Sequence, residues 1–357
     1  MSKPEAPWFY LQLYLAPPAM PAAAAPDAEA DALLREALLP ALAAAQASGR
    51  CRRWFFIRYG EGGYHLRLRA LADDAEAMDA ELERAVDGWL ALHPGRLGGA
   101  SGVSALRARG QWRRCDYEPE YDKYGGPAGV DAAERHFQAC SELTLAVLRL
   151  DAQGVRKDQV ALWLFGQAIA ASGLAVSEQQ ALCAGHAQFW QTGFADAGFS
   201  GAEPAAEILG RFYAARRDAI AQFLPAGDDD FTTAFATRRP AVELELGRVR
   251  ALYGATLARF IALERDGALR SPFLDHAAAL RMNPAELPTI AAAPLSGLLA
   301  LPNLVHMMNN RIGISVSREA QLAWYVAARL AERHGAAAPL SLVLEPAALA
   351  PRAGIAA

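Results

Sequence analysis

Cysteine is scarce in this chain of 357 residues, and none of the four cysteines belongs to a Cys-x-x-Cys pair. Zinc clamps and dithiol redox centres use that short spacing, so neither is predicted. We interpret the residues at 51, 115, 140 and 183 as free thiols. The sequence also lacks an apolar run long enough to span a bilayer, and its first residues do not resemble a secretory signal. We therefore expect a cytoplasmic protein without membrane contact.

Several common catalytic motifs are missing as well. The chain contains no phosphate-binding Gly-rich loop with Lys and Ser or Thr, no Gly-x-Ser-x-Gly, no His-Glu-x-x-His and no dinucleotide fingerprint. The sequence therefore lacks the motifs that usually accompany ATP hydrolysis, hydride transfer and zinc peptidase activity. We expect neither a cofactor nor a metal ion.

Neither sign of charge dominates, because 35 Lys and Arg residues face 39 Asp and Glu residues, for a net charge of -4. A general nucleic-acid binder needs a surplus of clustered basic residues, so this balance argues against that class. Apolar residues make up 53% of the chain and charged residues 21%, which is typical of a folded globular protein.

The first third of the chain alternates between strand-like and helical patterns. In the aromatic first segment, Phe9, Leu11 and Leu13 recur at period two and so share one face of a strand. The predicted strands cover 8–15, 54–59, 64–69 and 111–117, and the predicted helices cover 27–49, with a kink at Pro40, and 74–92. This order matches the split βαβ arrangement, so residues 1–128 are predicted to form an α+β module.

The remainder, residues 129–357, reads almost entirely at the helical period. We predict helices over 131–150, 156–172, 177–192, 203–223, 242–265, 284–299, 302–311 and 317–333, and a last strand over 340–344. The predicted fold class is therefore α+β, with an N-terminal split βαβ-like module and a larger, mainly helical C-terminal part. We expect the two parts to form one compact catalytic unit.

Three polar patches are candidates for chemistry. On the third predicted strand, alternation places His65, Arg67 and Arg69 on one face, where paired guanidinium groups can bind carboxylate or phosphate. The alternative is a solvated outer face of a sheet. In the predicted helix 302–311, His306 lies in a polar stripe with Asn310 and is suited to proton transfer. Its alternative is a core histidine whose hydrogen bonds are satisfied.

The third patch is the segment 117–127, which combines three carboxylates, three tyrosines and Lys123 ahead of a Gly-Gly pair. Its alternative is a solvated loop in which the glycines allow unusual backbone angles.

Taken in order, these patches resemble the C-terminal elimination domain of the class I lanthipeptide dehydratases, the thiopeptide-type bacteriocin biosynthesis family. The segments that carry the resemblance are 8–14, 54–69, 117–126 with Ala133, Glu134 and Phe137, and 306–311. The resemblance spans most of the chain and implies an enzyme, a lyase of natural product biosynthesis. Such a lyase expels glutamate from glutamylated Ser or Thr of a ribosomally made precursor peptide, leaving dehydroalanine or dehydrobutyrine.

The resemblance also implies partners. They are a leader-core precursor peptide and a separate protein that glutamylates it from glutamyl-tRNA, so that this chain acts as a stand-alone eliminase without binding tRNA directly. Homodimer formation is left open. Stand-alone relatives include thiopeptide pyridine synthases, which join two dehydroalanines by aza-cycloaddition. That activity is one alternative, and a non-enzymatic role in docking the leader peptide or the partner is another.

The family's functional residues carry over onto matching positions. The resemblance implies that Arg67 and Arg69 bind the glutamyl group and the developing charge, and that His306 transfers the proton. It adds His65, Glu120, Lys123, Asn310 and Arg311 as expected substrate-binding or supporting residues. One departure is Lys123, because the family has an arginine directly before Tyr-Gly-Gly. Lysine keeps the charge but loses the bidentate fork, which weakens the expectation of elimination.

Overall fold

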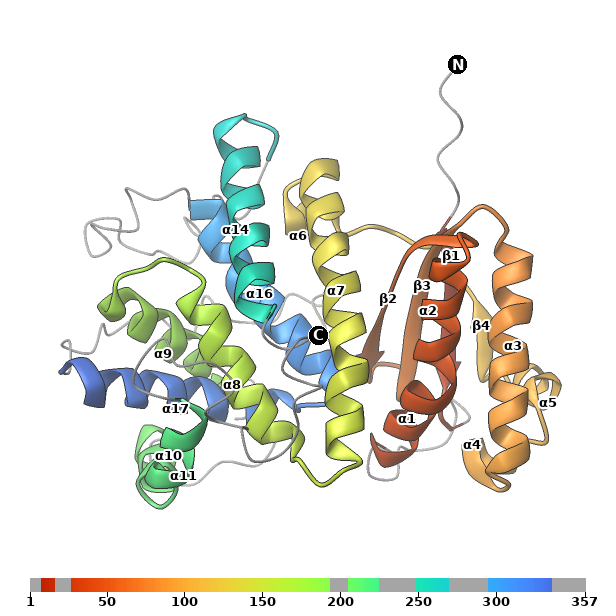
Figure 1. Ribbon diagram of the computed structural model, residues 1–357, viewed down its shortest axis with the longest axis horizontal. Helices are drawn as coiled ribbons and strands as arrows, with labels where there is room; N and C mark the ends of the chain where they lie inside the picture. Colours follow the sequence, from red (N-terminus) through yellow and green to blue (C-terminus); the bar gives the residue numbers. More distant parts are fainter. Residues whose placement is uncertain (1–7, 17–26, 193–204, 225–247, 270–294, 336–357) are drawn as a thin grey trace. The chain divides into compact units, whose positions relative to one another are not determined.

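The computed structural model describes residues 8–16, 27–192, 205–224, 248–269 and 295–335. The chain divides into two compact units (Figure 1), which we name by their content. The sheet unit contains the described residues up to 119 together with 137–153. The helical unit contains 120–136 and the described residues from 154 to 335. The expected functional division at residue 128 stays a prediction.

The sheet unit is built on four antiparallel strands in the order β2-β3-β1-β4. Their bounds are β1 Trp8–Tyr14, β2 Cys51–Tyr59, β3 His65–Ala72 and β4 Trp112–Arg114. β2 and β3 form the predicted hairpin, and Gly62 and Gly63 in its loop adopt positive φ. Strand, helix, strand, strand, helix, strand is the order along the chain, as the split βαβ arrangement requires.

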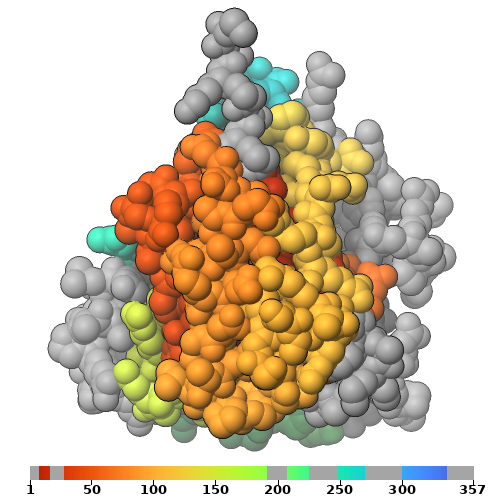
Figure 2. Space-filling view, turned by 90° about the vertical axis from the view of Figure 1, so that its right-hand side faces the viewer, coloured from red at the N-terminus to blue at the C-terminus, as the bar shows by residue number. Residues whose placement is uncertain are grey.

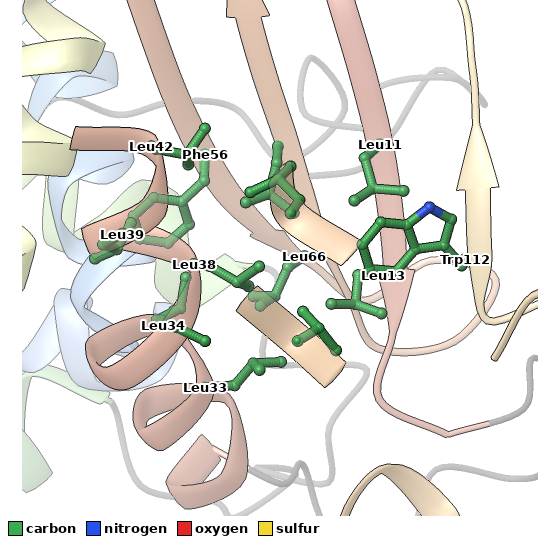
Figure 3. Close-up of a cluster of buried hydrophobic side chains, with 14 of the residues drawn as sticks. Leu11, Leu13, Leu33, Leu34, Leu38, Leu39, Leu42, Phe56, Leu66 and Trp112 are labelled. Carbon is green, nitrogen blue, oxygen red and sulfur yellow. The ribbon is translucent and has the colours of Figure 1, made fainter. Parts of the chain in front are cut away.

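Alternation along the strands gives the sheet one apolar face. Leu11 pairs with Leu68, and Leu13 pairs with Leu66, and all four side chains are fully buried. They pack under a helical layer formed by α1 (Asp27–Leu33), a π-helical turn (Leu34–Leu38) and α2 (Leu39–Ala47). Figure 3 shows leucines of this layer close to Phe56 and Leu66, and Leu11 and Leu13 of β1 beside Trp112. The core of the unit is therefore formed by every second residue of the strands, packed against the residues on one side of the helices.

The helix that we predicted to kink at Pro40 is irregular just before that residue. A π-helical turn precedes it, and the N–H of Leu39 donates to the carbonyl of Leu34, five residues back. The wider turn accommodates the proline, which lacks an N–H group, while Leu38, Leu39 and Leu42 stay buried.

The remaining helices of the sheet unit are α3 (Ala75–Leu92), α4 (Arg96–Gly99) and α5 (Val103–Ala108). Asp74 caps α3 by accepting a hydrogen bond from the N–H of Ala77 at 2.9 Å. Figure 2 shows α3 to α5 as one continuous outer surface, drawn in orange. Beneath it, the indole of Trp112 donates to Asp79 at 2.9 Å and so ties β4 to α3.

Helix α7 (Pro127–Asp151) contributes to both units, because its residues from 137 onward are part of the sheet unit. There, the Ser141 hydroxyl accepts from the N–H of Phe56 at 3.3 Å and donates to the Phe137 carbonyl at 2.8 Å. One edge group of β2 is thereby satisfied by a helix instead of another strand.

The helical unit contains α6 (Tyr121–Tyr124), the first part of α7 and a set of longer helices. These are α8 Lys157–Ala170, α9 Val176–Thr192, α10 Ala205–Ala214, α11 Arg217–Phe223, α14 Val249–Arg265, α16 Leu295–Ile312 and α17 Val316–His334. The α+β fold class, with a small sheet and a mainly helical C-terminal part, is confirmed.

Two helix predictions differ from the structure. The single helix expected over 203–223 is broken at Arg216, whose side chain turns back to donate to the carbonyl of Phe212 at 3.4 Å. The break predicted before Pro302 is wrong, because α16 passes through that residue. A proline removes one helical hydrogen bond, and the buried Leu301, Leu304 and Val305 offset this loss by packing.

Some predictions lie wholly or partly outside the described residues. They are the strand over 340–344 and the parts of three predicted helices that cover 203–204, 242–247 and 284–294. The four cysteines are free, as expected. Among the described helices, none combines the length and the apolar character needed to cross a membrane.

Candidate functional site

The face of the sheet opposite the leucine core carries the predicted arginine pair. We call it the arginine face and define it by Tyr10, Tyr14, Phe55, Tyr59, His65, Arg67 and Arg69. Neighbouring members are brought together by strand pairing, since Tyr10 pairs with Arg69 and Tyr59 pairs with His65. His65, Arg67 and Arg69 therefore share a face, while Leu66 and Leu68 point into the core.

Both arginines lie over aromatic rings. The Cζ of Arg67 is 3.3 Å from the ring centroid of Tyr59, and that of Arg69 is 4.8 Å from the centroid of Tyr10. Arg69 also lies 5.0 Å from the centroid of Tyr117. The two side chains are half-buried. Aromatic contact and partial burial hold the guanidinium groups more firmly than a solvated sheet face would, and this is suited to binding an anion.

His65 supports Arg67 directly. Its Nδ1 lies 2.7 Å from the carbonyl of Gly63 and its Nε2 lies 3.0 Å from the Nε of Arg67. A carbonyl only accepts and an arginine only donates, so Nδ1 carries the proton and Nε2 accepts. Burial, together with the charges of nearby arginines, lowers the pKa of His65 to about 4 despite the Gly63 hydrogen bond, which raises it. The imidazole is therefore a neutral acceptor.

The segment 117–127 is not a simple loop, because it contains helix α6, which ends at Gly125 in the left-handed region. Lys123 extends from this helix, with its Nζ 3.5 Å from the Oε1 of Glu120 and 5.6 Å from the ring centroid of Tyr124. Gly129 is needed for packing, since a Cβ there would lie 1.6 Å from the carbonyl oxygen of Tyr124. Lys123 and Glu120 thus form a partly exposed pair on a short, tightly packed turn.

His306 lies in the middle of α16 and is nearly buried. Its Nδ1 is 3.0 Å from the Oε2 of Glu319, and its ring lies 4.5 Å from that of Trp190 at an interplanar angle of 31°. In the part of the chain that the structure describes, Nε2 has no hydrogen-bond partner. A core histidine with satisfied hydrogen bonds would use both ring nitrogens, whereas His306 uses one among the described residues.

Sequence reasoning missed Glu319 and His186. Glu319 occupies the first turn of α17, a common position for a surface acid, yet its side chain is fully buried. Its other oxygen, Oε1, lies 2.6 Å from the Nε2 of His186 on α9. The available signal was spacing, because Glu319 precedes Leu322, Ala323 and Val326 by three, four and seven residues on the buried stripe of the helix.

Asn310 and Arg311 follow His306 on α16. Asn310 is half-buried, whereas Arg311 is fully buried and donates from Nη1 to the carbonyl of Met307 at 2.6 Å. Arg311 lies near His136, whose Nδ1 is 3.0 Å from the Thr256 hydroxyl. Burial, and then the charge of Arg311, lowers the pKa of His136 to about 3. A substrate-binding role for Asn310 and Arg311 stays a prediction.

Each unit therefore carries its own group of candidate residues. The sheet unit brings together Arg67, Arg69 and His65, and the helical unit brings His306 to Glu319 and, separately, Lys123 to Glu120. That Arg67, Arg69 and His306 act in one pocket stays a prediction. Over the described ranges, no group of three His, Cys, Asp or Glu side chains is arranged to hold a metal ion.

Comparison with solved structures finds the same fold in other proteins, three of which are TbtD, TsrL and MibB. The pyridine synthase TbtD from thiomuracin biosynthesis has a TM-score of 0.59 at 18% identity, over 91% of this chain and 98% of TbtD. TsrL has a TM-score of 0.58 at 14% identity, over 96% of this chain and 97% of TsrL.

The tRNA-dependent lantibiotic dehydratase MibB from Microbispora sp. 107891 has a TM-score of 0.55 at 20% identity. The match covers 94% of this chain but 29% of MibB. No curated protein sequence matches the chain. Residues 8–331 match the family described as Lantibiotic biosynthesis dehydratase C-term. That match extends over nearly the whole chain, from β1 to α17, and the chain belongs to this family.

Proposed function

We propose that this protein is a lyase that eliminates glutamate from glutamylated Ser or Thr residues of a ribosomally made precursor peptide. The products are dehydroalanine or dehydrobutyrine and free glutamate. The substrate would come from a glutamyl-tRNA-dependent glutamylating activity. The reaction would belong to the biosynthesis of a lanthipeptide or thiopeptide-type product in the cytoplasm.

The observation that carries this proposal is the arrangement of His306. Its Nδ1 is bonded to a buried carboxylate, and its Nε2 has no hydrogen-bond partner among the described residues. An imidazole oriented in this way has its second nitrogen available for proton transfer. A chain that only docks a leader peptide would have no need of such an arrangement.

In the proposed reaction, His306 and the two arginines have different roles. Nε2 of His306 takes the proton from Cα, the electrons of that C–H bond form the Cα–Cβ double bond, and the Cβ–O bond breaks. Glutamate leaves with the bonding electrons as its side-chain or main-chain carboxylate. The guanidinium groups of Arg67 and Arg69 bind these carboxylates and stabilise the charge that develops during the step.

The test is mass spectrometry of a cognate glutamylated precursor incubated with and without the protein. Under the proposal, each glutamylated residue loses glutamate and becomes a dehydro residue. Peptide that keeps its glutamate despite binding tightly to the protein would contradict elimination and support the docking role. The control is the His306→Gln variant, which keeps a side chain of similar size without a titrating imidazole.

A second candidate is the aza-cycloaddition of two dehydroalanines, the activity of a pyridine synthase. The observation that favours it is Lys123, which stands where the resemblance expects an arginine. A single ammonium group binds a glutamyl carboxylate less specifically than a guanidinium fork does. The same mass spectrometry separates the candidates, because cycloaddition of a dehydrated precursor forms a pyridine and releases the leader peptide.

A further inference from the structure

The Glu319 carboxylate joins three helices of the helical unit. It lies on α17 and accepts from His306 of α16 at 3.0 Å through Oε2 and from His186 of α9 at 2.6 Å through Oε1. Glu319 is fully buried, so water does not satisfy either oxygen. Its position depends on both imidazoles, and the orientation of each imidazole depends on it.

Glu319 is ionised in the folded protein. Burial alone would raise its pKa, but the hydrogen bonds from His186 and His306 outweigh burial and lower the pKa to about 2. An ionised carboxylate can only accept hydrogen bonds, so Nδ1 of His306 and Nε2 of His186 must both carry protons. Trp190 Nε1 also lies 3.2 Å from that His186 nitrogen. An indole N–H only donates, so it forms no hydrogen bond with a nitrogen that carries a proton, and the hydrogen of His186 Nε2 points to the closer Glu319.

We propose that Glu319 is a positioning residue that holds the proton of His306 on Nδ1, so that Nε2 presents its lone pair to the substrate. This inference rests on the proposed function. Once Nε2 has taken a proton, the same carboxylate stabilises the imidazolium. The ring of Trp190, 4.5 Å away, restricts rotation of the imidazole plane. His186 in turn holds the second oxygen of Glu319.

A purely structural contact explains the arrangement less well. A buried carboxylate is costly to desolvate, and apolar side chains of similar volume would join three helices at least as well. A structural histidine would also use both of its ring nitrogens, whereas Nε2 of His306 has no partner in the described part of the chain. Among the described residues, the side chains that pair with Glu319 are the two histidines, so no other ion pair within these ranges accounts for its burial.

The variant that tests this inference is Glu319→Gln. An amide of the same shape has one accepting oxygen and one donating NH2 group. The closer partner, His186, is expected to keep the oxygen, so the NH2 group faces Nδ1 of His306. That nitrogen must then accept, and the proton moves to Nε2. The matched control is Glu332→Gln on the same helix, which removes a partly exposed carboxylate paired with Arg217 and Arg329.

The direct readout is the tautomer of His306, measured by nitrogen NMR of histidine-labelled protein without substrate at about pH 9, where histidine is ordinarily neutral. The His306→Gln spectrum identifies the signal. Wild type and Glu332→Gln should carry the proton on Nδ1, and Glu319→Gln should carry it on Nε2. A wild-type His306 with its proton on Nε2 would overturn the inference, even if Glu319→Gln failed to fold.

The kinetic readout is turnover of the glutamylated precursor. Glu319→Gln should lower kcat at least about 100-fold with little change in KM, because the wrong tautomer binds substrate but cannot accept the proton. Unchanged kcat in folded Glu319→Gln protein would also overturn the inference. The NMR result does not depend on turnover, so it tests the role of Glu319 by itself. A failure of the proposed function would be seen separately, as wild-type protein that releases no glutamate.

Discussion

Arg67 donates from its Nε to the Nε2 of His65 across 3.0 Å, two positions away on the same strand. His65 is stacked on Tyr14, with ring centroids 4.3 Å apart, and donates to the carbonyl of Gly63. The stacking and this hydrogen bond fix the orientation of the imidazole that accepts from Arg67. The orientation of the Arg67 fork is set by a neutral imidazole and by the Tyr59 ring beneath it.

Replacing His65 with Phe should weaken binding of the glutamylated precursor. Phenylalanine preserves the stacking on Tyr14 but cannot accept from Arg67, so the guanidinium loses one of its two constraints. We expect KM to rise about tenfold with little change in kcat, because the lost contact serves ground state and transition state alike. Arg52→Gln is the control, since it removes a more exposed arginine of β2. Equal KM values for His65→Phe and wild type would contradict this role.

His306→Ala should abolish elimination while leaving leader-peptide affinity nearly unchanged. A proton-transfer group contributes mainly in the transition state, so the rate should fall at least about 100-fold. Turnover and peptide binding are measured on the same preparation. A large drop in the melting midpoint of the variant, together with a lost helical signal, would instead mean that His306 stabilises the core.

Lys123 tests the one departure from the family pattern. Lys123→Ala should slow elimination strongly if its ammonium group binds a glutamyl carboxylate, and Lys123→Arg should be tolerated or faster because the fork restores bidentate contacts. The measurement is turnover of one precursor by the three proteins under one set of conditions. Equal rates would show that the residue takes no part, which is the result expected for its surface contact with Glu120 alone.

The buried His136 should make the fold sensitive to acid. Its folded pKa of about 3 lies below the ordinary 6.5, so stability is fully present above pH 6.5 and is lost as pH falls toward 3. Between pH 6.5 and 5 this histidine alone should cost about 2 kcal/mol of unfolding free energy.

The variant that isolates this effect is His136→Gln, which can still donate to Thr256 but does not titrate. Its free energy of unfolding, from urea denaturation at pH 7 and pH 5, should change less between the two values than that of wild type. The same pH dependence in both proteins would place the acid sensitivity elsewhere, for example at His65.

Much of the sheet unit could be predicted because its patterns are local. Period-two alternation separated Leu66 and Leu68 from Arg67 and Arg69, and the order of elements specified the split βαβ topology. The π-helical turn before Pro40 could not be predicted. A proline signals a disturbed helix, but how the chain absorbs it depends on packing around Leu38 and Leu39.

Only part of the candidate site could be predicted from the sequence. His306 could be singled out because a histidine in an apolar helix is unusual, but its partner Glu319 follows thirteen residues later in a different helix. His186 is more distant still, 133 residues from Glu319. Contacts between helices depend on tertiary packing, and one sequence contains no direct record of that packing. An acid on the apolar stripe of α17 was the sole local sign.

The most direct test of the central claim is the release of free glutamate from a cognate glutamylated precursor by wild-type protein, measured together with the mass of the peptide. We predict one glutamate released for each dehydroalanine or dehydrobutyrine formed, and no release with His306→Gln. A precursor that binds the protein yet keeps all of its glutamyl groups would contradict the assignment as a lyase.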